Sequence, residues 1–257
     1  MTSLETQNLT IRFGGHVAVD DVSCTFRPGE LTAIVGPNGA GKTTYFNLIS
    51  GQLVATAGEV LLEGRDITRL SAPARTRAGI GRAFQLTNLF PGLSVMENVR
   101  LAIQSQAGVH YDMLRPWMRH TELIDRADAV LARVALGARR DVPASVLSHG
   151  DQRKLEVALM IALEPKIFMF DEPTAGMSVD EVPVVLDLIA QLKQDKSKTV
   201  LLVEHKMDVV RSLADRIIVL HNGTLMADGD PAEVIASPIV QQAYLGTVEP
   251  AAEVAHG

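Results

Sequence analysis

The segment Gly36-Pro-Asn-Gly-Ala-Gly-Lys-Thr43 follows Leu31–Val35, a short apolar run that predicts a buried strand, and leads into a helical pattern at 43–50. Two glycines separated by four residues and followed by Lys and Thr are typical of a loop that holds phosphate groups. Small residues let successive backbone N–H groups surround phosphate oxygens, and the helix directs its positive end at the same anion. The residues expected to contact a nucleotide here are Gly36, Pro37, Asn38, Gly39, Ala40, Gly41, Lys42, Thr43 and Thr44.

Two side chains of this loop have distinct expected roles. Lys42 is expected to reach the β- and γ-phosphates, and the Thr43 hydroxyl to ligate Mg²⁺. A chance glycine turn is the competing explanation, but four fixed positions would coincide in a chain of this length only about 1% of the time. The loop alone does not name a reaction, because kinases, GTPases and motor ATPases share it.

A second signal is the run Ile167–Phe170, which ends in two carboxylates, Asp171 and Glu172. A buried strand that carries an acid at its C-terminal end places that acid at the nucleotide crevice of an α/β sheet. Asp171 is then the expected Mg²⁺ partner, usually through water, and Glu172 can polarise an attacking water. The alternative is a polar strand end whose carboxylates cap the following helix.

The order of apolar patterns predicts the fold class. Strand patterns alternate with helical ones, which predicts an α/β protein with a mostly parallel sheet and crossover helices. Between about residues 87 and 164 the strand signals vanish, and three helical patterns indicate an inserted helical segment. The expected strands are 4–12, 17–28, 31–35, 60–62, 167–170, 199–203 and 216–220.

Composition excludes several classes. The net charge of −6 argues against a protein that binds nucleic acid, because a basic face supplies most of that affinity. The single cysteine, Cys24, excludes an intramolecular disulfide framework and cysteine-rich metal sites, and the histidines lack the paired spacing of zinc ligands. No run approaches the roughly 18–20 apolar residues that span a bilayer, so any work at a membrane requires a partner.

The segment Leu147-Ser-His-Gly-Asp-Gln152 precedes a helical pattern at 153–163, shortly before the paired carboxylates. Here the sequence resembles the nucleotide-binding subunits of ABC transporters, whose signature is Leu-Ser-Gly-Gly-Gln. In that family two subunits face head to tail, and the signature of one completes the nucleotide site of the other. The resemblance therefore implies that Ser148 and Gly150 contact the γ-phosphate of the partner's ATP, with their helix N-terminus directed at it.

The resemblance assigns further residues and the activity, ATP hydrolysis with Mg²⁺. Phe13 matches the aromatic ring that stacks on adenine, although a Phe in the core is the alternative. Gln85 matches the glutamine that approaches Mg²⁺ and water, and His205 the histidine that contacts the γ-phosphate. The implied catalytic residues are thus Glu172, His205, Gln85 and Lys42, and the implied Mg²⁺ ligands are Thr43, Gln85 and Asp171.

Two positions depart from the family pattern. His149 replaces the first signature glycine, so the backbone there must suit a residue with a Cβ atom. Ser178 stands where many relatives carry an aspartate that helps to couple the two sites, so that role is not transferred to Ser178. Asp180 and Glu181 are expected to favour the N-terminus of the next helix.

Several stretches, among them Arg12–Gly15 and Tyr244–Gly246, resemble the ATPases of importers for branched-chain amino acids, urea and short amides. This implies two permease subunits, a second similar ATPase that is identical or different, a periplasmic binding protein reached indirectly, and no nucleic acid. The subunit would lie at the cytoplasmic face of the inner membrane. The implied division is one ATP-binding domain at 1–246, with a core and an N-terminal antiparallel β subdomain at 1–86 and 165–246, a helical subdomain at 87–164, and a flexible tail at 247–257.

Two other functions are alternatives to transport. A soluble ABC ATPase of translation or DNA repair would commonly carry two ATPase units, coiled coils or basic tracts, none of which the sequence contains. A small-molecule P-loop kinase would need an arginine-bearing lid and an acceptor pocket, and would not need the signature at Ser148.

Overall fold

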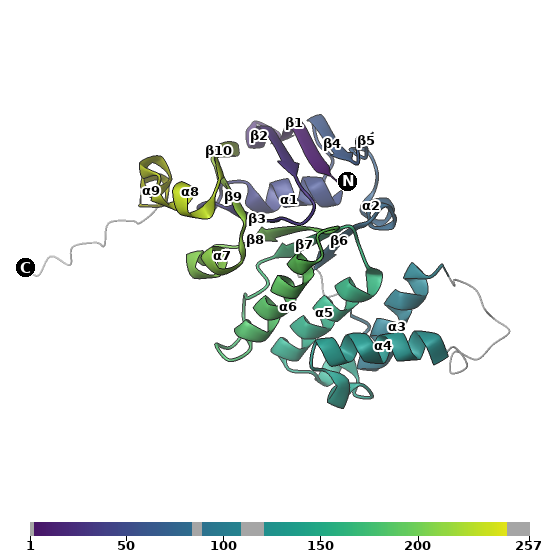
Figure 1. Ribbon diagram of the computed structural model, residues 1–257. Coiled ribbons are helices and arrows are strands. Elements are labelled where there is room, and N and C mark those ends of the chain that lie inside the picture. The colour runs from purple at the N-terminus through teal and green to yellow at the C-terminus, as the bar shows by residue number, and fades with distance from the viewer. Residues whose placement is uncertain (1–2, 84–88, 109–120, 246–257) are drawn as a thin grey trace, which may run out of the picture.

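The computed structural model describes residues 3–83, 89–108 and 121–245. Figure 1 shows the strands of two sheets stacked above a group of helices. In chain order the elements are β1 (Leu4–Phe13), β2 (His16–Phe26), β3 (Leu31–Val35), α1 (Lys42–Ser50), β4 (Ala57–Leu62), β5 (Arg65–Asp66), α2 (Ala72–Ala78), β6 (Ile80–Ala83), α3 (Val95–Gln106), α4 (Thr121–Arg133), α5 (His149–Leu163), β7 (Ile167–Asp171), α6 (Val182–Gln194), β8 (Thr199–Val203), α7 (Met207–Leu213), β9 (Arg216–His221), β10 (Thr224–Gly229), α8 (Pro231–Ala236) and α9 (Pro238–Leu245).

The larger sheet has the strand order β10-β9-β3-β8-β7-β6, in which only β10 pairs antiparallel to its neighbour. The smaller sheet, β2-β1-β4-β5, is antiparallel. The α/β class with an N-terminal antiparallel sheet is therefore confirmed. Short apolar runs form the central strands β3, β7 and β8, whose residues are all buried, as expected for parallel strands covered on both faces.

Alternating side chains of β7 divide the core in two. Ile167 and Met169 face the layer that holds helix α1 and the small sheet, whereas Phe168 and Phe170 face α5 and α6. Burying each such side chain contributes about 1.5–3 kcal/mol. Helix α1 thus lies between the two sheets, and its first residues emerge at the carboxyl ends of the parallel strands (Figure 1).

Helices α3, α4 and α5 fall in the segment predicted to be helical, and no strand is found in its described part, 89–108 and 121–164. None of the helices in the described residues has the length and apolar character needed to cross a bilayer. The predicted tail at 247–257 lies outside the described residues.

The sequence patterns missed β5, β6, β10, α8 and α9. Strand β6 reads Ile-Gly-Arg-Ala, so it lacks both an apolar run and regular alternation. It forms a strand because it pairs along β7 at the edge of the sheet. Gly81 in its centre is packed closely: a Cβ atom there would lie 2.8 Å from Pro165 Cγ and 3.0 Å from Met160 Cε at the end of α5.

Arg75 on α2 binds the C-terminal end of helix α1. Its side chain is almost completely buried, and burial lowers its pKa to about 10. The guanidinium donates to the carbonyl oxygens of Leu48 (2.6 Å) and Ile49 (2.7 Å) in the last turn of α1. It also donates to the carbonyl oxygens of Leu70 (3.1 Å) and Thr68 (2.6 Å). One side chain therefore satisfies carbonyl groups at the end of α1 and in the loop before α2.

Arg75→Ala is expected to lower the free energy of unfolding by about 3 kcal/mol or more, because buried carbonyl groups lose a charged donor. Urea denaturation followed by circular dichroism measures the change. Arg77, on the same helix but exposed, provides the matched control, and Arg77→Ala should change the free energy by no more than about 0.5 kcal/mol. Equal effects of the two substitutions would contradict the role given to Arg75.

Candidate nucleotide site

The loop after β3 is shaped by its glycines. Gly36 has φ 151°, and a Cβ atom there would collide with the Leu220 carbonyl oxygen on β9. Gly41, the N-cap of α1, has φ 95°, and a Cβ atom would lie 2.5 Å from the Ala18 carbonyl oxygen. Gly39 has φ 80°, but a Cβ atom there would meet nothing within 4 Å. The protein therefore requires Gly36 and Gly41, whereas Gly39 faces open space that a ligand can approach.

Lys42 is the first residue of helix α1, and its ammonium group bends back into the loop. Nζ donates to the carbonyl oxygens of Gly36 (2.6 Å) and Pro37 (2.9 Å). Burial lowers the pKa of Lys42, and the charges of Glu172 and Asp171 oppose that shift. A phosphate at the N-terminus of α1 would lie within reach of this cation and of the helix dipole.

A cavity of about 430 Å³ opens at this loop, large enough for a small ligand. Phe13 lines it and is 49% exposed, so the alternative that Phe13 is a core residue is wrong. His16 and Ala18 from β2 also line the cavity, and neither was predicted. They follow Phe13 across the turn to β2, which is why the same hairpin brings them there. The predicted residues among its lining are Phe13, Asn38, Gly39, Ala40, Gly41, Lys42, Thr43, Thr44 and Glu172.

The paired carboxylates have different surroundings. Asp171, the last residue of β7, is buried and pairs with Arg82 NH2 at 2.8 Å. Glu172 lies just past the strand in the left-handed region, φ 49°, and its side chain is 43% exposed. Neither acid caps the next helix, because the N-cap of α6 is Glu181. The capping alternative is therefore wrong.

His205 lies beside Glu172 at the end of the neighbouring strand β8. Its Nδ1 atom is 3.7 Å from Glu172 Oε1 and 3.6 Å from Glu204 Oε2. Glu204, whose role was not predicted, is completely buried. It accepts hydrogen bonds from Thr174 Oγ1 (2.7 Å) and from the backbone N–H groups of His205 (2.8 Å) and Lys206 (3.1 Å).

Glu204 therefore ties the loop after β8, which carries His205, to the loop after β7, which carries Glu172. The pattern that revealed Asp171, an apolar strand ending in an acid, is repeated at 199–204 and could have pointed to it. Gln85 lies outside the described residues.

The signature residues begin helix α5. Ser148 is its N-cap, and Ser148 Oγ accepts a hydrogen bond from the Asp151 N–H group at 3.1 Å. His149 is helical and absent from the residues with positive φ, so its Cβ atom causes no backbone strain. Ser148 and Gly150 do not line the 430 Å³ cavity of their own chain. The resemblance assigned them to the site of a second subunit.

The loop after Glu172 contacts the signature through Glu181. The Glu181 carboxylate fills the space in which a Cβ atom of Gly150 would stand. Oε2 of Glu181 accepts from Ser178 Oγ at 3.0 Å, and no capping bond to helix α6 is formed by this side chain. Glu181 is the N-cap residue of α6, so its charge lies at the start of that helix as expected, although it makes no capping hydrogen bond. Its carboxylate turns back to Ser178 and Gly150.

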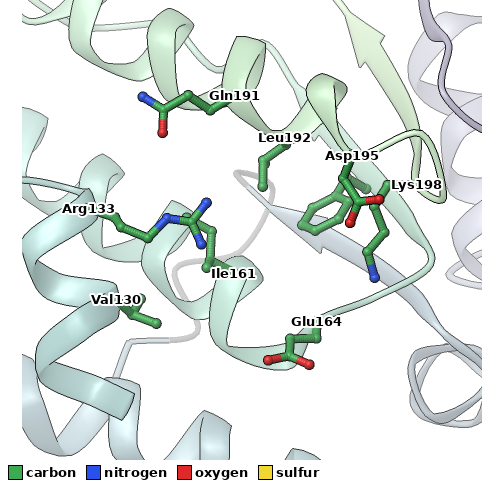
Figure 2. A pocket seen from close by; sticks show the side chains of 9 residues that line it. Val130, Arg133, Ile161, Glu164, Gln191, Leu192, Asp195 and Lys198 are labelled. Carbon is green, nitrogen blue, oxygen red and sulfur yellow. The ribbon is translucent and has the colours of Figure 1, made fainter. Parts of the chain in front are cut away.

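A second cavity, of about 310 Å³, lies near the amino ends of β7 and β8. Figure 2 shows the side chains that line it; Ile161, Phe168 and Leu192 are buried, and Arg133, Glu164 and Asp195 are exposed. No predicted site residue lines it. Ligands of open α/β sheets bind outside the carboxyl ends of the strands, so the cavity at Lys42 is the candidate nucleotide site.

The fold and this loop have counterparts among known proteins. Residues 19–175, more than half of the chain, match the family model described as ABC transporter. The chain belongs to the ABC transporter family. Within that family, residues 224–250 match a second model, described as branched-chain amino acid ATP-binding cassette transporter.

Similar ABC proteins cover nearly the whole chain. The high-affinity branched-chain amino acid transport ATP-binding protein LivG of Salmonella typhimurium is 40% identical over 95% of this chain and 97% of its own length. BraF of Pseudomonas aeruginosa, with the same description, is 36% identical over the same shares.

Solved ABC cassettes share the fold. The ADP conformation of one ATP-binding cassette superposes with a TM-score of 0.81 at 30% identity, covering 96% of this chain and 99% of that one. A dimeric cassette in a post-hydrolysis state, bound to ADP and Pi, has a TM-score of 0.75 at 28% identity, covering 89% of this chain and 98% of that one.

Gly39→Ala tests the open side of the loop. At φ 80° an alanine costs about 1–2 kcal/mol of stability, and its Cβ atom enters the space left for phosphate oxygens. Nucleotide affinity, measured by isothermal titration calorimetry, should fall about tenfold or more, equal to at least 1.4 kcal/mol. Gly64, with φ 75° and nothing within 4 Å, is the control: Gly64→Ala should cost similar stability and leave affinity unchanged. Unchanged affinity in Gly39→Ala would contradict the expected contact between Gly39 and the phosphate groups.

Proposed function

We propose that this chain is the ATP-binding and ATP-hydrolysing subunit of an ABC importer that takes up branched-chain amino acids or related small solutes. The observation that carries the proposal is near full-length similarity to proteins named for high-affinity branched-chain amino acid transport. The match of residues 224–250 to the branched-chain amino acid cassette model supports the same solute class over urea and short amides.

In the proposed site, the loop and Lys42 bind the phosphates, and the Phe13 ring stacks on the base, which contributes roughly 1–3 kcal/mol. Thr43 at the start of α1 and Asp171 at the end of β7 would hold Mg²⁺. Gln85, which lies outside the described residues, is the third proposed ligand. Hydroxyl and carboxylate oxygens are ligands that Mg²⁺ prefers. When bound, the metal ion neutralises charge on the phosphate oxygens.

Glu172 is proposed to polarise the attacking water. Its exposed carboxylate lies on the cavity, whereas the Asp171 carboxylate is buried in an ion pair with Arg82. His205, 3.7 Å from Glu172, would contact the γ-phosphate, and Glu204 holds the backbone of its loop. A positioned general base contributes about 10²–10⁴-fold to the rate.

The working unit is proposed to be a pair of ATPase subunits, with the partner identical or similar. Ser148 and Gly150 of each subunit would complete the nucleotide site of the other, with the N-terminus of α5 directed at the γ-phosphate. ATP would then contact both subunits only in the closed pair and shift the equilibrium by that difference in affinity.

The pair would act on two permease subunits at the cytoplasmic face of the membrane, served by a periplasmic binding protein. Residues 87–164, as a helical subdomain of one ATP-binding domain at 1–246, would contact the permeases. A soluble ABC ATPase without transport partners is the competing function. Near full-length similarity to transport ATP-binding proteins does not favour it.

Glu172→Gln is expected to lower kcat for ATP hydrolysis by about 10²–10⁴-fold, because the amide cannot accept the proton of the attacking water. Nucleotide binding should persist, so the variant should form an ATP-dependent dimer in light scattering. Lys42→Ala is the contrasting variant and should lose nucleotide binding itself. Wild-type hydrolysis by either variant would overturn the roles assigned here.

The transport function is tested by purifying the tagged chain from detergent-solubilised native membranes and identifying the proteins that come with it. Two polytopic permeases and a second, similar ATPase are the expected partners. Recovery of ribosomes, DNA-repair factors or nothing reproducible would contradict the transport role. The ATPase assignment would then stand or fall on the Glu172 and Lys42 variants.

A further inference from the structure

Asp171 and Arg82 form a buried ion pair directly behind the nucleotide site. Their side chains are 7% and 8% exposed, and Arg82 NH2 donates to Asp171 Oδ2 at 2.8 Å. The two residues come from neighbouring parallel strands, β7 and β6. Neither Arg82 nor Asp171 lines the 430 Å³ cavity.

The same guanidinium is also anchored to helix α1. Its NH1 atom donates to Asn47 Oδ1 at 2.6 Å and to Ser50 Oγ at 2.7 Å. Its Cζ atom lies 4.9 Å from the centroid of the Phe46 ring, within the range of a cation–π contact. Arg82 thus joins the strand that ends in Asp171 to the helix that begins with Lys42 and Thr43.

This arrangement fixes one oxygen of the carboxylate and leaves the other available. Among the described residues, no hydrogen-bond donor reaches Asp171 Oδ1. A buried carboxylate without a partner would be costly, and an ion pair held by further hydrogen bonds fixes the carboxylate in one orientation. A guanidinium is planar and donates in several fixed directions at once, which a lysine ammonium on a flexible stem cannot reproduce.

We propose that Arg82 is a positioning residue for Asp171: its guanidinium, anchored to Asn47 and Ser50, holds Oδ2 in one orientation and leaves Oδ1 available to bind Mg²⁺ together with Thr43. This inference rests on the proposed function, because it takes Asp171 and Thr43 as the metal partners. Residues that orient metal ligands typically change metal affinity by about 10–100-fold when they are replaced.

Two substitutions of Arg82 distinguish the effect of its guanidinium geometry from the effect of its positive charge. Arg82→Lys keeps the positive charge and loses the planar fork, whereas Arg82→Gln loses both. If Arg82 positions Asp171, both variants bind the metal more weakly. If it acts only as a nearby positive charge, Arg82→Lys behaves as the wild type, and Arg82→Gln binds the cation more tightly because a repulsive charge is gone.

The test measures Mn²⁺ binding by electron paramagnetic resonance, with the chain saturated by a non-hydrolysable ATP analogue. Mn²⁺ serves as the spectroscopic substitute for Mg²⁺. Both Arg82 variants should bind Mn²⁺ in the ternary complex about tenfold or more weakly, with an altered spectrum of the bound ion. In ATPase assays kcat should fall more than KM for ATP rises, because the phosphate-binding loop is untouched.

Arg75→Lys is the matched control. Arg75 is also buried and contacts helix α1, but its hydrogen bonds go to backbone carbonyls and none goes to Asp171. It should lower the thermal midpoint to a similar extent and leave Mn²⁺ affinity within about twofold of the wild type. A loss of Mn²⁺ affinity in Arg75→Lys equal to that in Arg82→Lys would overturn the inference, because a general loosening of α1 would explain both.

Two further results would each overturn one of the proposals. Wild-type Mn²⁺ affinity in Arg82→Lys would overturn the positioning role and leave the proposed ATPase function intact. A wild-type chain that forms no ternary complex with Mn²⁺ and nucleotide would overturn the proposed function, and this inference with it.

Discussion

Helix α1 is held at both of its ends, and the geometry of the nucleotide site depends on this. At its start, glycines at 36 and 41 let the loop pass close to the carbonyl groups of Leu220 and Ala18. At its end, Arg75 donates to the carbonyl oxygens of Leu48 and Ile49 in the last turn of the helix. A helix fixed in this way cannot slide between the two sheets, so the N–H groups and Lys42 at its N-terminus are oriented before any ligand arrives. Such preorganisation avoids an ordering cost when the ligand binds.

The two adjacent carboxylates show how one strand end places two acids in different surroundings. Asp171 still belongs to β7 and points into a region where a guanidinium compensates its charge. One residue later the backbone enters the left-handed region, a conformation that costs about 1 kcal/mol or more for a residue with a Cβ atom. This turn brings Glu172 out of the buried layer toward solvent and His205. A rigid buried acid and an exposed acid thus follow each other in the chain.

The parts of the fold that could be predicted were those whose signal lies within a short stretch of sequence. The apolar runs at 31–35, 167–170 and 199–203 became strands because each is long enough to be buried on both faces. Strand β6 could not be predicted, because its pairing with β7 is a tertiary interaction and its sequence carries no alternation. The contacts of Glu204 and Glu181 could not be predicted for a related reason. Their partners, Thr174 and Gly150, are about thirty residues away along the chain, and only the packed fold brings them together.

Strand β6 has one further consequence, which follows from its place at the edge of the sheet. Consecutive residues of a strand point to opposite faces, so Gly81 and Arg82 face different neighbours: the end of helix α5 on one side, Asp171 and α1 on the other. An edge strand has a hydrogen-bonded neighbour on one side only, which makes it easier to displace than a central strand. Because Gly81 packs directly against Pro165 and Met160, its lack of a side chain sets how near α5 lies to the sheet. Because α5 is a continuous helix with Ser148 at its other end, a change in volume at Gly81 would tilt the whole helix and shift the signature turn. In the proposed pair of subunits, the small size of Gly81 would thus set where one subunit presents its signature to the other.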